Sequence, residues 1–303
     1  AEYARKLTKT EIFEYFISKK LELEEKRTPT KKKELIKRVQ EKLALLMEIY
    51  QTNILSKEEL MTFFDDVESN LNISLLQQVP LESFYNRSLL KDNLDTIEFE
   101  NTEFQEYLAA KEMLRLGRAD QSIFDIAVDQ EIKEISPSWF NTLKYAIDLD
   151  ISLLKPILHF GASGDSIVQD EEYHRLLTTV DTNRLPVEDR KDIFRNIFNY
   201  YNRVQHWIRF DIARNLSHYF DVSQYSLLKE SIEAKTATYI TKSNAASILD
   251  FLIEMNLFKQ PEKEYWKSRL IEFIKEKNSV LQRAAIAALS KFKDLALIKQ
   301  VSE

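Results

Sequence analysis

The sequence contains no cysteine, which excludes disulfide bonds and thiolate metal sites. Its 303 residues include only three glycines and six prolines. Because tight hairpin turns depend on glycine, this scarcity favours helices joined by polar loops over a sheet-rich fold. We therefore expect a mainly α protein, and the lack of cysteine is compatible with the cytoplasmic location that we predict.

Long apolar segments are also missing. No stretch approaches the roughly 20 apolar residues that cross a membrane, and the N-terminus lacks the charged-then-apolar pattern of a signal peptide. The formal net charge is −6, whereas a surface built to contact phosphate backbones needs an excess of positive charge. We expect neither a membrane partner nor nucleic acid.

Motifs for catalysis and metal binding are absent as well. There is no G-x-x-x-x-G-K-[ST] phosphate loop, and the one close glycine pair, in FGASGDS at 160–166, lacks its lysine. The four histidines do not form H-E-x-x-H, so packed or surface histidines are the simpler interpretation. We predict no catalytic residue, no metal and no cofactor in this chain.

The N-terminal part of the sequence shows helical patterns instead. Thr8 to about Arg27 is amphipathic, and Pro29 with the lysines at 31–33 indicates a solvated linker. The residues expected on the packed side of this first helix are Ile12, Phe13, Tyr15, Phe16 and Ile17. A second helix is predicted from about Glu34 by its apolar spacing.

Further helices and a hairpin follow. Ser56-x-x-Glu59 is a capping box that opens a third helix, and more helical sequence covers residues 72–78. The stretch SLLKDNLDTIEFEN, residues 88–101, has two short apolar runs about turn-forming Asp and Asn, which predicts a β-hairpin. Three helices and a small hairpin are the order of a winged-helix module. Its expected recognition segment, residues 73–84, has no basic residue, which disfavours DNA binding.

Residues 97–113, IEFENTEFQEYLAAKEM, change from a strand pattern to a helix pattern within two residues. Thr102-x-x-Gln105 is a second capping box, and Gly117 is a plausible stop. We expect Phe104 and Tyr107 to be buried between the hairpin and the helices that follow. The small side chains of Ala109 and Ala110 leave room for another backbone.

Beyond Gly117 the sequence predicts only helical blocks, with no further strand. Two of these blocks cover about 123–135 and 188–216. The clearest pair lies in residues 265–292, where small alanines allow two helices to pack closely. Because repeat identity is weak upstream, we predict an irregular α-solenoid of HEAT-like helical hairpins over residues 118–303.

The stretch 97–113 also resembles the C-terminal signature of NACHT-type STAND nucleotide-switch ATPases. There, a wing strand with F-x-H is followed by a [ST]-F-Q-E-Y-x-A-A helix. The matching residues are Phe99, Phe104, Gln105, Glu106, Tyr107, Ala109 and Ala110. The resemblance, which covers about Thr8 to Leu116, implies the end of a helical domain and a linker at 1–30, a winged-helix domain at 31–117 and an α-solenoid sensor at 118–303.

One position departs from the family pattern. The family histidine of F-x-H faces the nucleotide phosphates in the inactive state, and here its place is taken by Asn101. Asn101 could contact nucleotide through its amide or simply cap the following helix, and both interpretations stay open. The resemblance further implies that ATP or ADP with Mg²⁺ binds an upstream nucleotide-binding domain of a parent ATPase. The start at Ala1 in place of Met suggests an excised fragment, although processing or a tag remnant would look the same.

The leading hypothesis is therefore the regulatory and ligand-sensing portion of a NACHT-type STAND NTPase, which in bacterial relatives implies defence signalling. A protein ligand is expected on the solenoid, where large aromatic side chains are efficient anchors, although core filling is the alternative for them. The candidate anchors are Tyr200, Tyr201, Trp207, Tyr219 and Trp266. The alternatives are a stand-alone helical scaffold for partner proteins and an enzyme with a dispersed helical site.

Overall fold

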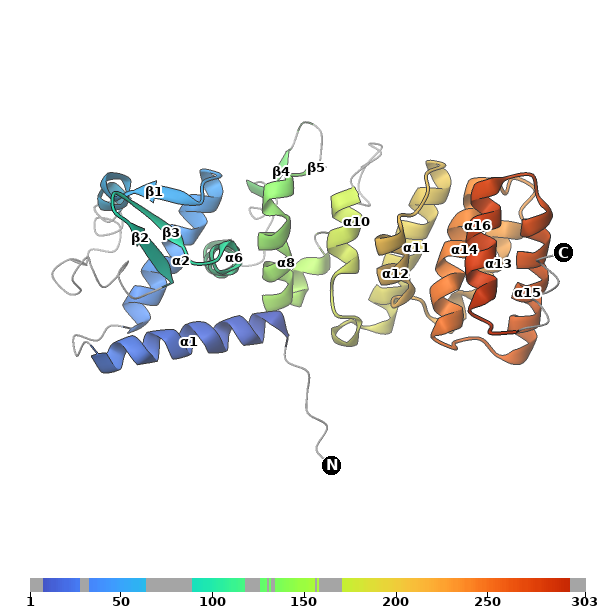
Figure 1. The fold of residues 1–303 in the computed structure, drawn as a ribbon, viewed down its shortest axis with the longest axis horizontal. Coiled ribbons are helices and arrows are strands. Elements are labelled where there is room, and N and C mark those ends of the chain that lie inside the picture. Colours follow the sequence, from blue (N-terminus) through green and yellow to red (C-terminus); the bar gives the residue numbers. More distant parts are fainter. Residues whose placement is uncertain are drawn as a thin grey trace, which may run out of the picture. The chain divides into compact units, whose positions relative to one another are not determined.

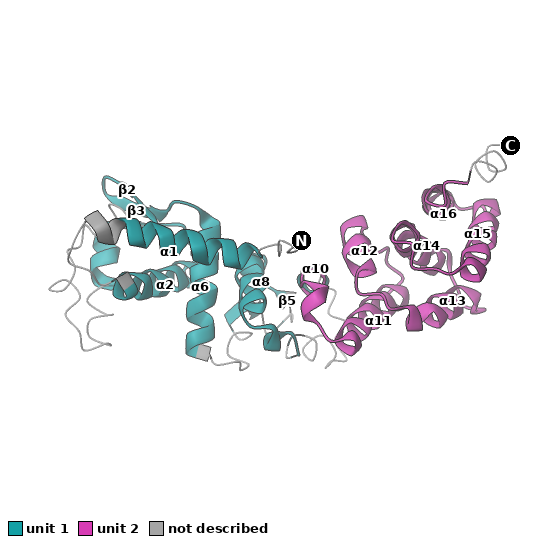
Figure 2. Ribbon diagram, turned by 90° about the horizontal axis from the view of Figure 1, so that it is seen from below, with its two compact units in different colours: residues 1–176 teal, residues 177–303 magenta. Residues whose placement is uncertain are grey.

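The computed structural model describes residues 8–27, 33–63, 89–117, 126–129, 131, 134–155, 157 and 171–294. The protein is mainly helical, as expected, with small antiparallel sheets (Figure 1). It divides into two compact units, residues 1–176 and 177–303 (Figure 2). The boundaries predicted after residues 30 and 117 both fall inside unit 1. The helix predicted at 72–78 and the glycine pair at 161–164 lie outside the described residues.

Unit 1 combines helices with both sheets. Its elements are α1 (Lys9–Arg27), α2 (Lys33–Ile49), β1 (Ile54–Ser56), a helix at 57–63, β2 (Leu90–Asn93), β3 (Thr96–Phe99), α6 (Thr102–Gly117), β4 (Val128–Asp129), β5 (Glu134–Ile135), the short η1 (Pro137–Trp139), α8 (Phe140–Leu149) and η2 (Ile151–Leu153). Helix α10 (Glu171–Thr178) contains the division between the units.

The predicted hairpin is confirmed by β2 and β3, which pair in antiparallel register around a two-residue turn at Leu94 and Asp95. A third strand, β1, pairs with the other edge of β3 and gives the sheet order β1-β3-β2. The sequence did not predict β1, because three residues are too short for an alternating pattern. The capping box after it does form. The Ser56 hydroxyl accepts the Glu59 N–H at 3.1 Å, and the Glu59 carboxylate accepts the Ser56 N–H at 2.7 Å.

The core of unit 1 is built around α6. Ala109 and Ala110 are fully buried, and α2 and α8 both pack against α6, as small residues at a helix contact allow. Helix α1 runs beside α2, α6 and α8 (Figure 1). Its packed side differs from the prediction, however. Phe13 and Ile17 are buried with Leu21, whereas Ile12, Tyr15 and Phe16 are exposed.

The helix predicted at about 123–135 is wrong for its second half. Val128 pairs with Ile135 and Asp129 with Glu134, forming the small antiparallel sheet of β4 and β5. Val128 and Ile135 are both buried. Strands of two residues leave no sequence periodicity, and the cross-strand contact between these apolar side chains exists only in the folded chain.

Unit 2 consists of packed helices with short connections. Its elements are η3 (Thr182–Arg184), α11 (Val187–Arg203), α12 (Phe210–Ser217), η4 (Val222–Gln224), α13 (Tyr225–Glu233), α14 (Tyr239–Glu254), α15 (Gln260–Lys275) and α16 (Ser279–Ser290). The predicted pair at 265–292 corresponds to α15 and α16, which pack together. The single block predicted at 188–216 is wrong, because the loop 204–209 separates α11 from α12.

Candidate functional site

Phe104 and Tyr107, two of the three aromatic residues of the family motif, are buried in an aromatic cluster. The Tyr107 ring meets Phe13 edge-on at 5.7 Å and Tyr145 at 6.0 Å, measured between centroids, while Phe104 stacks on Phe16 at 5.3 Å. The prediction of burial is thus confirmed. The expected neighbours are confirmed in part, because Tyr107 packs against α8, one of the helices that follow, while both rings also pack against α1, which the prediction did not name. This cluster fixes α6 in the centre of unit 1.

Asn101 occupies the N-cap position of α6. Its side-chain oxygen accepts the Glu103 N–H at 2.9 Å, and its backbone carbonyl accepts the Phe104 N–H at 3.0 Å. The capping box predicted between Thr102 and Gln105 does not form, because the Gln105 side-chain amide donates to Glu48 of α2 instead. The geometry supports the capping interpretation of Asn101, whereas nucleotide contact stays a prediction.

Replacing Asn101 tests this role. We expect Asn101→Ala to lower the free energy of unfolding by about 1 kcal/mol, since one orphan N–H of α6 loses its acceptor. Asn101→Asp keeps an acceptor oxygen and is expected to leave stability close to that of the wild type. Urea unfolding followed by circular dichroism measures both variants. Equal stability of the alanine variant and the wild type would contradict the cap.

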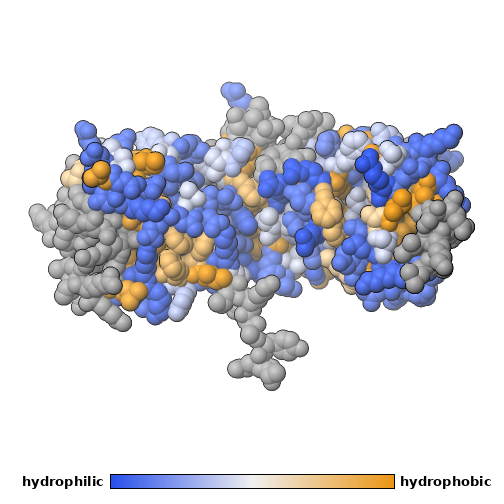
Figure 3. All heavy atoms as spheres, viewed as in Figure 1, coloured by the Kyte–Doolittle hydropathy of each residue, from blue (hydrophilic) through white to orange (hydrophobic). Residues whose placement is uncertain are grey.

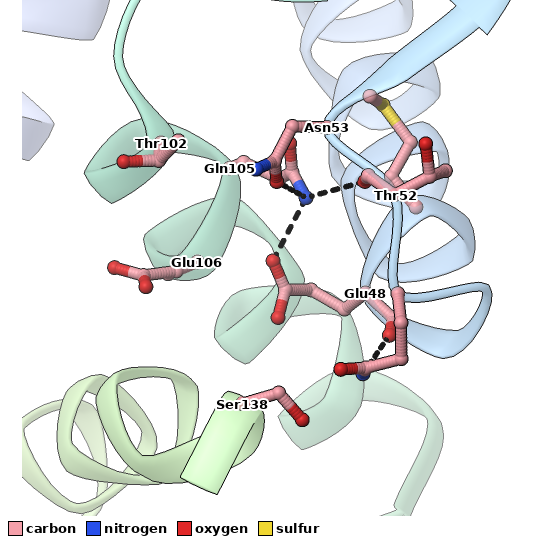
Figure 4. A pocket seen from close by; sticks show the side chains of 9 residues that line it. Glu48, Thr52, Asn53, Thr102, Gln105, Glu106 and Ser138 are labelled. Atoms are coloured by element: carbon pink, nitrogen blue, oxygen red, sulfur yellow. Dashed lines mark hydrogen bonds between the residues drawn. The ribbon is translucent and has the colours of Figure 1, made fainter.

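A polar pocket lies next to the motif helix, with a volume of about 310 Å³. It is lined by the end of α2, the segment that follows it, the first turns of α6 and Ser138 of η1 (Figure 4). The lining residues are Met47, Glu48, Gln51, Thr52, Asn53, Thr102, Gln105, Glu106 and Ser138. Because this lining is rich in acceptors and contains no cationic side chain, it is a poor site for phosphate groups.

Gln105 connects the two main elements that line this pocket. Its amide nitrogen donates to the Glu48 carboxylate at 2.9 Å and to the Thr52 carbonyl at 3.2 Å, so the motif glutamine links α6 to the end of α2 (Figure 4). Burial raises the pKa of Glu48, and hydrogen bonds from Gln105 and Thr142 partly offset that rise. Burial also raises the pKa of Glu106, the next motif residue.

An ion cluster connects α1 to the same motif helix. The Glu14 carboxylate accepts hydrogen bonds from the Lys111 ammonium and the Tyr107 hydroxyl, both at 2.7 Å, and from Lys37. Burial opposes ionisation of Glu14, but these three donors outweigh it and lower its pKa from 4.5 to about 2. The cluster therefore stabilises unit 1 when Glu14 is ionised.

This cluster predicts a loss of stability in acid. A depressed pKa in the folded state means that Glu14 contributes fully above pH 4.5 and that its contribution disappears as the pH falls toward about 2. We expect Glu14→Gln to be less stable than the wild type at neutral pH and to approach it near pH 2. Urea unfolding across this range measures the difference. A constant difference between the two proteins would contradict the assignment.

Three of the five predicted partner anchors belong to the core. Tyr201, Tyr219 and Trp266 are buried, so they are corrected from surface anchors to packing residues. Tyr201 continues the stripe of Phe194 and Phe198 at helical spacing, a signal already present in the sequence. Only Trp207 is exposed, at 44%, while Tyr200 is half-buried.

Two exposed aromatic residues of unit 2 were missed. Phe210 is 70% exposed and Tyr239 is 44% exposed, and each is the first residue of a helix. Phe210 follows a break that the sequence did not predict, because the block expected at 188–216 continued through it. First-turn residues at an unrecognised helix start cannot be assigned to a face.

In the described part of the chain, no group of three or more His, Cys, Asp or Glu residues could hold a metal ion. Within the same residues, no helix is both long and apolar enough to span a bilayer. His174 is buried, whereas His206 and His218 are exposed. Comparison with protein-family models, with curated proteins and with solved structures finds no match for this chain.

Proposed function

We propose that this chain is the regulatory and ligand-sensing portion of a NACHT-type STAND NTPase. Unit 1 contributes a winged-helix module that faces an upstream nucleotide-binding domain, and the helices that follow form an α-solenoid sensor for a protein ligand. Nucleotide chemistry, with ATP or ADP and Mg²⁺, belongs to the parent protein. In bacterial members of the resembled family this architecture serves defence signalling in the cytoplasm.

The observation that carries the proposal is the position of the motif helix. Helix α6 follows the hairpin directly, and its motif residues make the contacts that hold unit 1 together. Tyr107 contacts rings of α1 and α8, and Gln105 donates a hydrogen bond to Glu48 of α2. The small side chains of Ala109 and Ala110 allow close helix packing. Packing or hydrogen bonding within unit 1 accounts for these motif residues, and this agreement supports the resemblance.

A second observation supports an upstream partner domain. Ile12, Tyr15 and Leu23 are exposed on the side of α1 that does not pack on unit 1. Apolar side chains gather over this part of unit 1 in Figure 3. Large exposed apolar side chains along one helix are typical of a surface that another domain covers. The resembled family supplies the nucleotide-binding domain as that partner.

The proposal is tested on the complete gene product. We expect its reading frame to encode a G-x-x-x-x-G-K-[ST] loop upstream of this chain, and the purified protein to retain ADP. Gln105→Ala is expected to speed release of a fluorescent ADP analogue, because it disconnects α6 from α2. Glu103→Gln, which changes an exposed ion pair on the same helix, is the matched control. A gene product that has no such loop and binds no nucleotide would overturn the proposal in favour of a stand-alone scaffold.

A further inference from the structure

Two adjoining loops of unit 2 present exposed aromatic side chains. The loops 204–209 and 234–238 are joined by the Thr238 hydroxyl, which donates to the side-chain oxygen of Gln205 at 2.6 Å. Trp207 lies on the first loop and Tyr239 directly follows the second, with ring centroids 6.5 Å apart, and Phe210 follows at the start of α12. We call the neighbouring pair Trp207 and Tyr239 the aromatic platform.

A buried asparagine holds the platform loop in place. Asn244 of α14 accepts the Ile208 N–H at 2.9 Å and donates to the His206 carbonyl at 3.0 Å. The same amide donates to the Asn202 side chain at 3.0 Å. Because Asn244 is almost completely buried, the residues on both sides of Trp207 are fixed by the core. Trp207 is therefore exposed on a preorganised backbone.

The backbone of this loop has an uncommon conformation. Gln205 has a φ of 55°, in the left-handed region where the residue after a helix is usually glycine. Its side chain is engaged at both ends, with the amide nitrogen donating to the Asn202 carbonyl and the oxygen accepting from Thr238. A glutamine at this position adds the link to the second loop that glycine could not make. The two loops are thus held as one surface.

Exposed basic side chains lie on the same stretches of chain as the platform. Arg203 ends α11, while Arg209 and Lys235 lie on the two loops. All three are exposed, and Arg209 pairs with Asp211 at 3.3 Å. Within the residues that the structure describes, neither Arg203 nor Lys235 forms an ion pair. The whole chain carries a net charge of −6, whereas residues 203–211 and 234–239 together contain three Lys or Arg residues and one acidic residue. A partner that binds next to these basic residues is therefore expected to carry negative charge.

We infer that the aromatic platform, together with Arg203 and Lys235, is the docking surface for an acidic peptide segment of a partner protein that also carries apolar side chains. This inference rests on the proposed protein-sensing role of unit 2. Trp, Tyr and Arg are the residue types that dominate binding energy at protein interfaces, and a fixed loop loses little entropy on binding. Nucleic acid fits less well, because two free cations are few for a phosphate backbone.

The test selects random peptides from a display library on the full chain and measures their affinity by fluorescence polarisation. We expect the selected peptides to be enriched in Asp and Glu together with apolar residues. Trp207→Ala and Arg203→Glu are each expected to weaken binding at least about tenfold, in line with hot-spot residues. Lys277→Glu, a change of charge on an exposed residue of another loop, is expected to leave binding unchanged. Thermal unfolding checks that every variant is folded.

Three results would overturn the inference. Selected peptides could lack acidic residues, or they could bind equally well to Trp207→Ala and Arg203→Glu. Alternatively, single-stranded oligothymidylate could bind the chain and lose affinity in Arg203→Glu, which would assign the surface to nucleic acid. Peptides that bind elsewhere on unit 2 would show that the platform is not the docking surface, but they would leave the proposed sensing role of unit 2 intact. The nucleotide experiment on the complete gene product tests the proposed sensing role separately.

Discussion

Tyr107→Ala is expected to lower the free energy of unfolding by about 3 to 5 kcal/mol, the usual cost of removing a large buried aromatic side chain. The ring is 1% exposed and lies in contact with Phe13 and Tyr145. Its removal leaves a cavity where α1, α6 and α8 meet, and Glu14 loses one of its donors. Urea unfolding followed by far-ultraviolet circular dichroism gives the change.

Two further variants separate the causes. Tyr107→Phe keeps the ring and removes only the hydroxyl, so we expect a loss of about 1 kcal/mol for the hydrogen bond to Glu14. Tyr15→Ala removes the same side chain from an exposed position of α1 and is expected to change stability by about 0.5 kcal/mol or less. If Tyr107→Ala unfolds like Tyr15→Ala, α6 does not occupy the core described for unit 1.

Trp266→Ala is expected to have an effect of similar size in unit 2, again about 3 to 5 kcal/mol. Trp266 is fully buried on α15, and its ring meets Tyr225 at 5.9 Å and Phe258 at 6.4 Å between centroids. Because the side chain is a packing residue, its loss is expected to weaken peptide binding only through unfolding. The remaining folded protein should bind with unchanged affinity.

The exposed Trp207 is the matched comparison. Trp207→Ala is expected to change the free energy of unfolding by about 0.5 kcal/mol, as surface substitutions generally do, while it removes the peptide-binding anchor. The two tryptophans therefore separate stability from binding in one unit. Trp266→Ala with normal stability and impaired binding would restore that residue as a surface anchor and contradict its observed burial.

The candidate site was predictable where local chemistry determines it. The Ser56 capping box and the hairpin at 88–101 each depend on a few neighbouring residues, and both form. The start of α6 was predicted correctly, and Asn101 caps it, which is one of the two roles that the sequence left open. The capping box between Thr102 and Gln105, however, does not form. Gln105 was assigned to its own helix end, whereas in the fold its amide reaches the buried Glu48, 57 residues away in sequence. A contact of that sequence separation has no local signature.

The sequence by itself determined the helical class, through the scarcity of glycine and proline, and the burial of motif residues at helical spacing. Only the tertiary structure decided which aromatic residues of unit 2 are exposed. Tyr201, Trp207 and Phe210 lie within ten residues of each other in sequence, yet one is buried and two are exposed. The difference arises because the loop between α11 and α12 is held by Asn244 of α14. The chain turns at Gln205, where the His206 N–H bonds the Tyr201 carbonyl and ends α11, and Asn244 holds the loop that follows, so the helical period that buries Tyr201 no longer applies there.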